Sequence, residues 1–200
     1  TWDNGTTAAT AINLSAGTHC VTITDNNGCT DVQCVTITEP SSPVSASISA
    51  QTDALCAGTA TGTATAQGAG GTAPYTYSWQ TSPVQNTQMA DSLAAGIYNV
   101  IVTDANGCFV EETGGINNPP MLTTNVSSQA MVSCYGGSDG SVTVTANGGT
   151  PNYAIDWLTL ANDAFFMDNL AAGSYVAEVT DNNGCLSTLV VDITQPDSLM

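Results

Sequence analysis

The sequence contains no lysine and no arginine among its 200 residues, and it has a single histidine. Against 17 aspartates and glutamates, this leaves a formal net charge of −17 at pH 7. Because no fixed cation is available to neutralise phosphate, binding to nucleic acid and docking onto an anionic membrane surface are both excluded. Ion pairs between side chains are not expected either, and chemistry that needs a lysine is ruled out.

Long apolar runs are also missing, since none approaches the roughly 18 residues that span a bilayer. We therefore expect no direct insertion into a membrane. No leader peptide is visible, so any targeting signal is expected outside this sequence. With 42% apolar residues and only 8% charged ones, the composition favours a folded, β-rich chain over a disordered one.

Three segments of the chain repeat one pattern. Each begins at a tryptophan and ends on Thr-Asp-x-Asn-Gly-Cys, and the closing cysteines 29, 108 and 185 lie 79 and 77 residues apart. Every unit then continues to a junction marked by proline. The repeat predicts an extended array made of the C-terminal half of a module at 1–40, complete modules at 41–120 and 121–196, and the start of another at 197–200.

Within each module, apolar and polar residues alternate with a period of two, which predicts β-strands. Gly-Gly pairs and Asp-x-Asn-Gly turns separate these strands. About seven short strands in about 78 residues predict an all-β protein of tandem immunoglobulin-like sandwiches. Tyr75, Tyr77 and Trp79 occupy alternate positions and therefore share one face of a strand. Such a row of aromatic rings could stack on carbohydrate, but the alternation with polar residues favours the inward face and a place in the core.

The cysteines favour an oxidising, extracellular setting. We pair Cys56 with Cys108 and Cys134 with Cys185, one staple inside each complete module, because the separations are 52 and 51 residues. Closing such a loop removes about 4 kcal/mol of unfolded-state entropy in the chain model. Zinc is the alternative, but the cysteine spacings do not match paired Cys-x-x-Cys ligands.

The remaining cysteines lie near the N-terminus. Counting outward from the Asn26-Asn27-Gly28 turn places Cys20 opposite Cys34, which predicts a cross-strand disulfide. Cys29 is equivalent to Cys108 and Cys185, and we expect it to be unpaired in this sequence because its partner would belong to the missing half of the first module.

The combined motif of the complete modules resembles the SprB-type repeat of Bacteroidota, which occurs in very long cell-surface proteins including gliding-motility adhesins. The resemblance implies export by type IX secretion, attachment to the outer membrane through parts outside this sequence, and an extended filament of tandem domains. His19 stands where the pattern has tyrosine, and Ile155 replaces a second tyrosine. In the first complete module the motif is carried by Cys56, Gly58, Gly62, Gly71, Pro74, Tyr75, Tyr77, Trp79, Leu93, Gly96, Tyr98, Asp104, Gly107 and Cys108, and in the second by Cys134, Gly136, Gly140, Gly149, Pro151, Tyr153, Trp157, Leu170, Gly173, Tyr175, Asp181, Gly184 and Cys185.

Candidate sites are few. We interpret His19 as a partly buried structural residue, since no nucleophile accompanies it. No cofactor is expected; the aspartates of the three turns, Asp25, Asp104 and Asp181, are weak calcium candidates, but a hairpin turn explains them more simply. Ser92 and Ser198 follow an aspartate and precede a leucine, a pattern that resembles the O-glycosylation acceptor of Bacteroidota.

No set of residues suggests an enzyme, because neighbouring carboxylates such as Glu111 and Glu112 point to opposite sides of a strand. We interpret the chain as a structural stalk or spacer of a long extracellular adhesin at the cell surface, whose partners are neighbouring modules of the same chain. The alternative is a module that binds surface glycans or other cell-surface proteins through loops at the end of a sandwich, with Phe109, Phe165 and Phe166 as candidate contacts.

Overall fold

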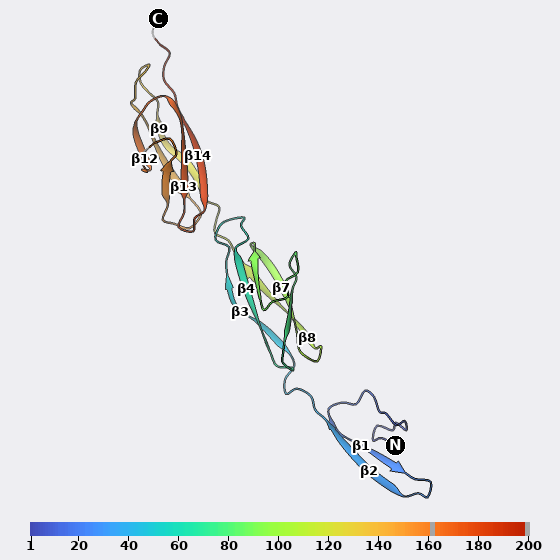
Figure 1. The fold of residues 1–200 in the computed structure, drawn as a ribbon. Helices are drawn as coiled ribbons and strands as arrows, with labels where there is room; N and C mark the ends of the chain where they lie inside the picture. The colour runs from blue at the N-terminus through green and yellow to red at the C-terminus, as the bar shows by residue number, and fades with distance from the viewer. Residues whose placement is uncertain (161–162, 199–200) are drawn as a thin grey trace.

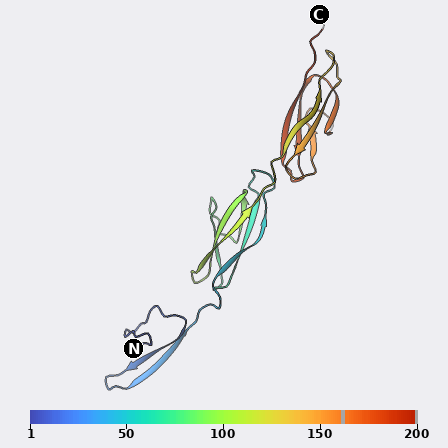
Figure 2. The ribbon, with the colours of Figure 1, turned by 180° about the vertical axis from the view of Figure 1, so that it is seen from behind.

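The structure, a computed structural model, describes residues 1–160 and 163–198. These residues form strands, turns and loops, and no helix occurs among them. Three bodies follow one another along the chain in an extended arrangement, with the first and the last described strands in the two outer bodies (Figures 1 and 2). The expected all-β class is confirmed. Of the four residues assigned to the start of a further module, Leu199 and Met200 lie outside the described range.

The first body is a single antiparallel hairpin. Its strands are β1 (Gly17–Thr24) and β2 (Thr30–Ile37), and Trp2 forms a bridge to Val21 on the outer side of β1. None of residues 1–40 is buried. A hairpin without a second sheet to pack against cannot enclose a core.

Residues 41–120 form a sandwich of two antiparallel sheets. One sheet has the order β3-β4-β6 and the other has the order β5-β7-β8. In immunoglobulin terms these correspond to strands A, B, E and C, F, G. The bounds are β3 (Ser45–Thr52), β4 (Gly62–Ala69), β5 (Thr76–Trp79), β6 (Met89–Leu93), β7 (Gly96–Thr103) and β8 (Phe109–Ile116).

Residues 121–196 repeat this arrangement in their described part. The sheets have the orders β12-β10-β9 and β11-β13-β14, and all pairs are again antiparallel. The bounds are β9 (Thr123–Ala130), β10 (Gly140–Asn147), β11 (Ala154–Trp157), β12 (Phe166–Leu170), β13 (Gly173–Thr180) and β14 (Leu186–Ile193).

The expectation of about seven strands per module was too high. In residues 41–120, all of which are described, six strands form, and the segment 80–88 between β5 and β6 contributes only a bridge from Gln85 to Trp79. Pro83 lies in this segment and has no N–H group to donate to a sheet. The strand that immunoglobulin domains place here is therefore absent from this module.

Each sandwich has a core of its own, centred on a tryptophan. Trp79 and Trp157 are fully buried, and each indole N–H donates a hydrogen bond to a backbone oxygen, of Thr87 at 3.1 Å and of Ala164 at 3.0 Å. The two clusters of buried residues share no member. Tyr75 and Tyr77 pack against the Trp79 cluster, so the aromatic strand faces the core as its parity predicted.

In each sandwich, a tyrosine also fixes the corner that leads into the central strand of the second sheet, β7 or β13. The Tyr98 hydroxyl donates to the Ala94 oxygen at 3.0 Å, and the Tyr175 hydroxyl donates to the Ala171 oxygen at 2.9 Å. Immunoglobulin-like sandwiches use a tyrosine at this corner in the same way.

Candidate functional site at the junction of two modules

The turn between β13 and β14 is organised by one carboxylate, that of Asp181, which is only 5% exposed. Its Oδ1 accepts the N–H groups of Asn183 and Cys185, each at 2.9 Å, and its Oδ2 accepts the N–H of Thr150 at 2.7 Å. Gly149 lies at φ +58°, and a Cβ there would stand 2.5 Å from Asp181 Oδ2. The carboxylate thus ties the turn to the loop before β11.

The other two turns are built alike. Asp104 Oδ1 accepts the N–H groups of Asn106 and Cys108, each at 2.9 Å, while Oδ2 accepts the N–H of Thr72 at 3.0 Å. Asp25 accepts the N–H groups two and four residues further along the chain, each at 2.8 Å. In all three turns, the cysteine that ends the repeat motif is therefore held in a fixed position.

These hydrogen bonds keep the buried carboxylates ionised. The N–H of Thr72 is the main cause that lowers the pKa of Asp104, and the other N–H groups of its turn outweigh the opposing effect of burial. For Asp181, burial raises the pKa, but the N–H groups of Thr150, Cys185 and the rest of the turn lower it further, so the net shift is downward.

The calcium candidates Asp25, Asp104 and Asp181 consequently serve the backbone of their own turns. Among residues 1–160 and 163–198, no group of three or more histidine, cysteine or acidic side chains is placed to hold a metal ion. The hairpin turn, the simpler interpretation of these residues, describes what their side chains do in the structure.

The other half of the junction is the loop between β3 and β4, which carries Cys56. The N–H of Ala54 donates to the Asn117 oxygen at 2.9 Å, so this loop lies at the C-terminal end of β8. Within the loop, the N–H of Thr59 donates to the Cys56 oxygen at 3.1 Å, and Gly58 has a φ of +77°. A tight, glycine-containing turn therefore presents the Cys56 side chain at the end of the sandwich.

The structure joins Cys56 to Cys185, which belong to different modules. Their Cα atoms are 5.6 Å apart and the sulfurs are bonded at 2.05 Å. Beside this bond the Asn183 side-chain amide donates to the Leu55 oxygen at 3.0 Å, a second contact between the modules. A groove of about 350 Å³ runs along the junction, lined by Cys56, Ala57, Thr59, Met121, Leu122, Gly184, Cys185 and Leu186.

The pairings expected inside the modules, Cys56 with Cys108 and Cys134 with Cys185, are therefore wrong in this structure. Cys108 immediately precedes β8, whereas the Cys56 loop lies at the end of β8. At about 3.3 Å per residue, an eight-residue strand separates the two positions by about 25 Å. Cysteines whose Cα atoms are more than about 7 Å apart cannot be bridged without moving the backbone.

The hairpin carries the other disulfide among the described residues. Cys20 and Cys34 are directly opposite in the register of β1 and β2 and are bonded, with their Cα atoms 4.1 Å apart. Cys29, Cys108 and Cys134 are free and exposed. Cys29 was expected to lack a partner, whereas the free thiols of Cys108 and Cys134 were not foreseen.

His19 is largely shielded and lies between two acceptors. Its Nε2 lies 2.9 Å from the Ser15 oxygen and its Nδ1 lies 3.2 Å from the Asp3 carboxylate. The Ser15 carbonyl, followed by Asp3, raises the pKa of this imidazole. When His19 is protonated it forms an ion pair with Asp3, so the expectation that the chain contains no side-chain ion pair was wrong.

The two serines of the glycosylation pattern are exposed. Ser92 has a φ of +53° at the end of β6, where the following Leu93 is buried. Asn169 occupies the equivalent position with a φ of +57°. Ser198 lies beyond the last strand. Glycosylation at both serines stays a prediction.

The three phenylalanines suggested as adhesive contacts lie in different environments. Phe165 packs against the core, whereas Phe166 is exposed on β12 and pairs with Thr143 of the neighbouring strand. Phe109 is 67% exposed and directly follows Cys108. Only Phe109 therefore combines an exposed aromatic ring with a position at the end of a sandwich.

Two antiparallel sheets per module, a buried tryptophan, a tyrosine corner and a covalent junction define a tandem-repeat protein of immunoglobulin-like modules. Comparison with known families then identifies the repeat: residues 48–84 and 126–162 match the SprB repeat. One match falls in each sandwich, and the resemblance read from the motifs is confirmed. Each sandwich therefore contains a segment that matches the SprB repeat. In the described part of the chain, no helix of the length and apolarity needed to cross a bilayer is found.

Solved structures of multidomain proteins are similar in part. The three N-terminal domains of the outer capsid protein Hoc of bacteriophage RB49 align with 76% of this chain at 17% identity and a TM-score of 0.44. The eight N-terminal immunoglobulin domains of Down Syndrome Cell Adhesion Molecule align with 91% at 13% identity and a TM-score of 0.39. The chain spans 58% and 28% of those structures, respectively. No protein of curated function matches the chain.

Proposed function

We propose that the chain is a structural segment, a stalk or spacer, of a long filamentous adhesin on the outside of a bacterial cell. The observation that carries this proposal is the disulfide between Cys56 and Cys185, which fastens two sandwiches end to end. A protein that needed only to connect two independent binding domains would gain nothing from such a link. A protein that must stay extended under tension gains a second covalent connection at the joint.

The composition supports the same function. With a net charge of −17 and no lysine or arginine, neighbouring filaments repel each other within a Debye length of about 8 Å at physiological salt. The same absence removes every cleavage site for trypsin-like proteases. Both properties suit a filament that is exposed to the surroundings of the cell.

The proposal includes a location and an export route. Disulfides persist in oxidising compartments, which supports an extracellular setting. Type IX secretion, attachment to the outer membrane through other parts of the protein, and a role in gliding are what the SprB repeat resemblance implies. We propose a non-catalytic role, because the buried carboxylates of Asp104 and Asp181 are engaged by backbone N–H groups and serve the fold.

Small-angle X-ray scattering of the complete 200-residue chain tests the stalk. A compact protein of this length has a radius of gyration of about 16 Å. We expect a clearly larger value and a pair-distance distribution with a long tail, both independent of protein concentration. A value near 16 Å would show that the modules fold back on each other and would contradict the proposal.

Binding through the end of a sandwich is a second candidate, favoured by the exposed Phe109 at the rim of a groove. The partners would be surface glycans or other cell-surface proteins. A glycan array probed with the complete chain and with Phe109→Ser tests it, because specific binding should be lost in the variant. Signals that do not differ between the two proteins would count against this function.

A further inference from the structure

Each free cysteine of the chain stands at a position that is disulfide-bonded in another module. Cys134 stands where Cys56 stands one module earlier, and Cys108 and Cys29 stand where Cys185 stands. Building on the proposed stalk function, we propose that these thiols are open halves of further junctions. Every junction of the array is then closed by a disulfide from the first loop of one module to the last turn of the next.

The loop of Cys134 already has the bonded geometry. The N–H of Val132 donates to the Thr194 oxygen at 3.0 Å, as Ala54 does to Asn117 in the bonded loop. The N–H of Gly137 donates to the Cys134 oxygen at 3.0 Å, and Gly136 has a φ of +74°, close to the +77° of its counterpart. The loop that presents Cys134 therefore needs no rearrangement to accept a partner.

The turn of Cys108 is likewise preformed. The Asn106 side-chain amide donates to the Thr72 hydroxyl at 2.9 Å, as that of Asn183 does to Thr150. Asn183 donates in addition to the Leu55 oxygen of the preceding module, whereas Asn106 has no such contact within the described chain. Asn106 is thus positioned to make the same contact across an equivalent junction.

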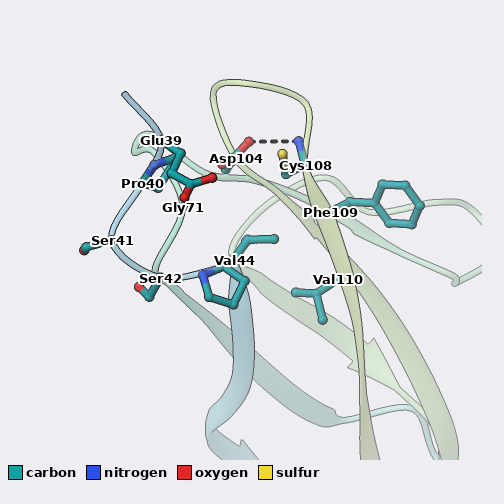
Figure 3. A pocket seen from close by; sticks show the side chains of 11 residues that line it. Glu39, Pro40, Ser41, Ser42, Val44, Gly71, Asp104, Cys108, Phe109 and Val110 are labelled. Atoms are coloured by element: carbon teal, nitrogen blue, oxygen red, sulfur yellow. Dashed lines mark hydrogen bonds between the residues drawn. The ribbon is translucent and has the colours of Figure 1, made fainter. Parts of the chain in front are cut away.

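The surface beside Cys108 is more open than the closed junction. Cys185 is 9% exposed in its disulfide, whereas Cys108 is exposed. The groove at Cys108 has a volume of about 640 Å³, compared with about 350 Å³ at the closed junction. Figure 3 shows the Cys108 side chain beside Asp104, with Phe109 pointing away from the linker; the groove is lined by Glu39, Pro40, Ser41, Ser42, Pro43, Val44, Gly71, Asp104, Cys108, Phe109 and Val110. We assign the extra space to the first loop of the preceding module.

The free thiols lie too far apart to form disulfides with each other within one chain. Cys108 lies directly before β8, whereas Cys134 lies in the loop after β9, which is hydrogen-bonded through Val132 to Thr194, just after the end of β14. Cys29 lies in the turn of the hairpin, one further module away. Each thiol therefore needs a cysteine from an adjoining module of the same type.

The chemistry of closure is thiol–disulfide exchange. A disulfide-bearing oxidoreductase accepts the two electrons and two protons of the thiols and becomes a dithiol, while one S–S bond forms between the modules. Within the chain, only the two cysteines change. The exposure of Cys108 and Cys134 gives such a carrier access.

A concatemer of the complete chain tests the inference. Ile37 and Ile193 end equivalent strands, so residues 1–193 followed directly by residues 38–200 reproduce the native spacing of modules. Replacing Cys108→Ser in the first copy and Cys134→Ser in the second leaves one complete pair at the new junction. Cleavage after aspartate and glutamate places every cysteine on a peptide of its own, and non-reducing mass spectrometry after alkylation then reads the pairing.

We expect the peptide of Cys134 to be linked to the peptide of Cys108, with Cys29 as the only alkylated cysteine. Alkylation of Cys134 and Cys108 as well, alongside intact Cys56–Cys185 bonds, would overturn the inference. The matched control carries Cys134→Ser in both copies and should leave Cys108 of the second copy free. Small-angle scattering from the same sample distinguishes the two proposals. An elongated concatemer with both thiols free would refute the proposed disulfide at every junction, while the proposed stalk function would still hold.

Discussion

At the scale of single residues, backbone N–H groups stabilise the buried carboxylates of this chain, a role that lysine and arginine side chains play in other proteins. Asp104 and Asp181 are buried carboxylates in a protein without lysine or arginine, and each receives N–H groups from its own turn and from a loop before the neighbouring strand. A carboxylate that accepts several N–H bonds is stabilised in its charged form. The negative charge of these two residues is therefore a structural requirement of the turns.

Acid should weaken this arrangement first. Because the folded-state pKa of Asp104 and of Asp181 is lowered, their contribution to the free energy of unfolding is complete above the ordinary aspartate pKa of about 3.9 and is lost as the pH falls through the folded value. We expect the melting temperature to fall steeply below about pH 4. In Asp104→Asn, the melting temperature of residues 41–120 should be lower at pH 7 and should depend less on pH.

Differential scanning calorimetry between pH 2.5 and pH 7 measures both effects. Glu111→Gln, at an exposed position of β8, is the matched control and should follow the parent chain. An Asp104→Asn variant with the same pH dependence as the parent chain would contradict the assigned role of the carboxylate.

The buried tryptophans provide a test of core independence. Trp79→Ala should destabilise its sandwich by about 3–5 kcal/mol, which is a large part of the stability of a small domain. Hydrogen exchange should then show loss of amide protection in residues 41–120 and retained protection in 121–160 and 163–196. Trp157→Ala should give the reverse. Loss of protection in both sandwiches from a single substitution would show that they share one core.

At the scale of elements, the alternation of apolar residues was sufficient to predict strands and sandwiches, but the cysteine pairing was not predictable from chain separation. Cys56 and Cys108 are 52 residues apart in sequence, but separation along the chain does not decide which cysteines meet. What matters is the end of the sandwich at which each lies: the Cys56 loop lies at the C-terminal end of β8, and Cys108 lies directly before its start. The Asp-x-Asn-Gly turn before Cys108 was the signal that could have shown this.

The disulfide between the two modules could not be predicted from the sequence for another reason. Its formation depends on how the junction around residues 117–122 places one sandwich above another, and the period-two pattern contains no such information. The repeat did contain one indirect sign. When the two cysteines of each module lie at opposite ends of its sandwich, they can form disulfides only with cysteines of the neighbouring modules.

The hairpin of β1 and β2 should respond to pH in the opposite sense to the aspartate turns. His19 has a raised pKa because of the Ser15 carbonyl and Asp3, so its stabilising contribution is complete below the ordinary histidine value of about 6.5 and is lost as the pH rises through the folded value. An NMR titration of the imidazole should give a midpoint above 6.5, and Asp3→Asn should lower it. Equal midpoints in both proteins would exclude the contact with Asp3.

At the scale of the whole molecule, the bond between Cys56 and Cys185 should control the angle between the two sandwiches. Cys56→Ser removes the bond, so we expect a broader pair-distance distribution in small-angle scattering, with unchanged hydrogen exchange inside each sandwich. Cys20→Ser is the matched control, because it removes a disulfide that lies within the hairpin. Identical scattering from Cys56→Ser and the parent chain would mean that the linker alone sets the angle.

Two covalent connections side by side have a mechanical meaning that one connection lacks. Modules joined by a single peptide can swivel about it, so a twist applied at one end dissipates at the joint. At the junction in this chain, the peptide linker and the disulfide leave the sandwiches at separate points, and rotation of one sandwich must turn the other. A filament assembled from such joints conveys torque along its length as well as tension.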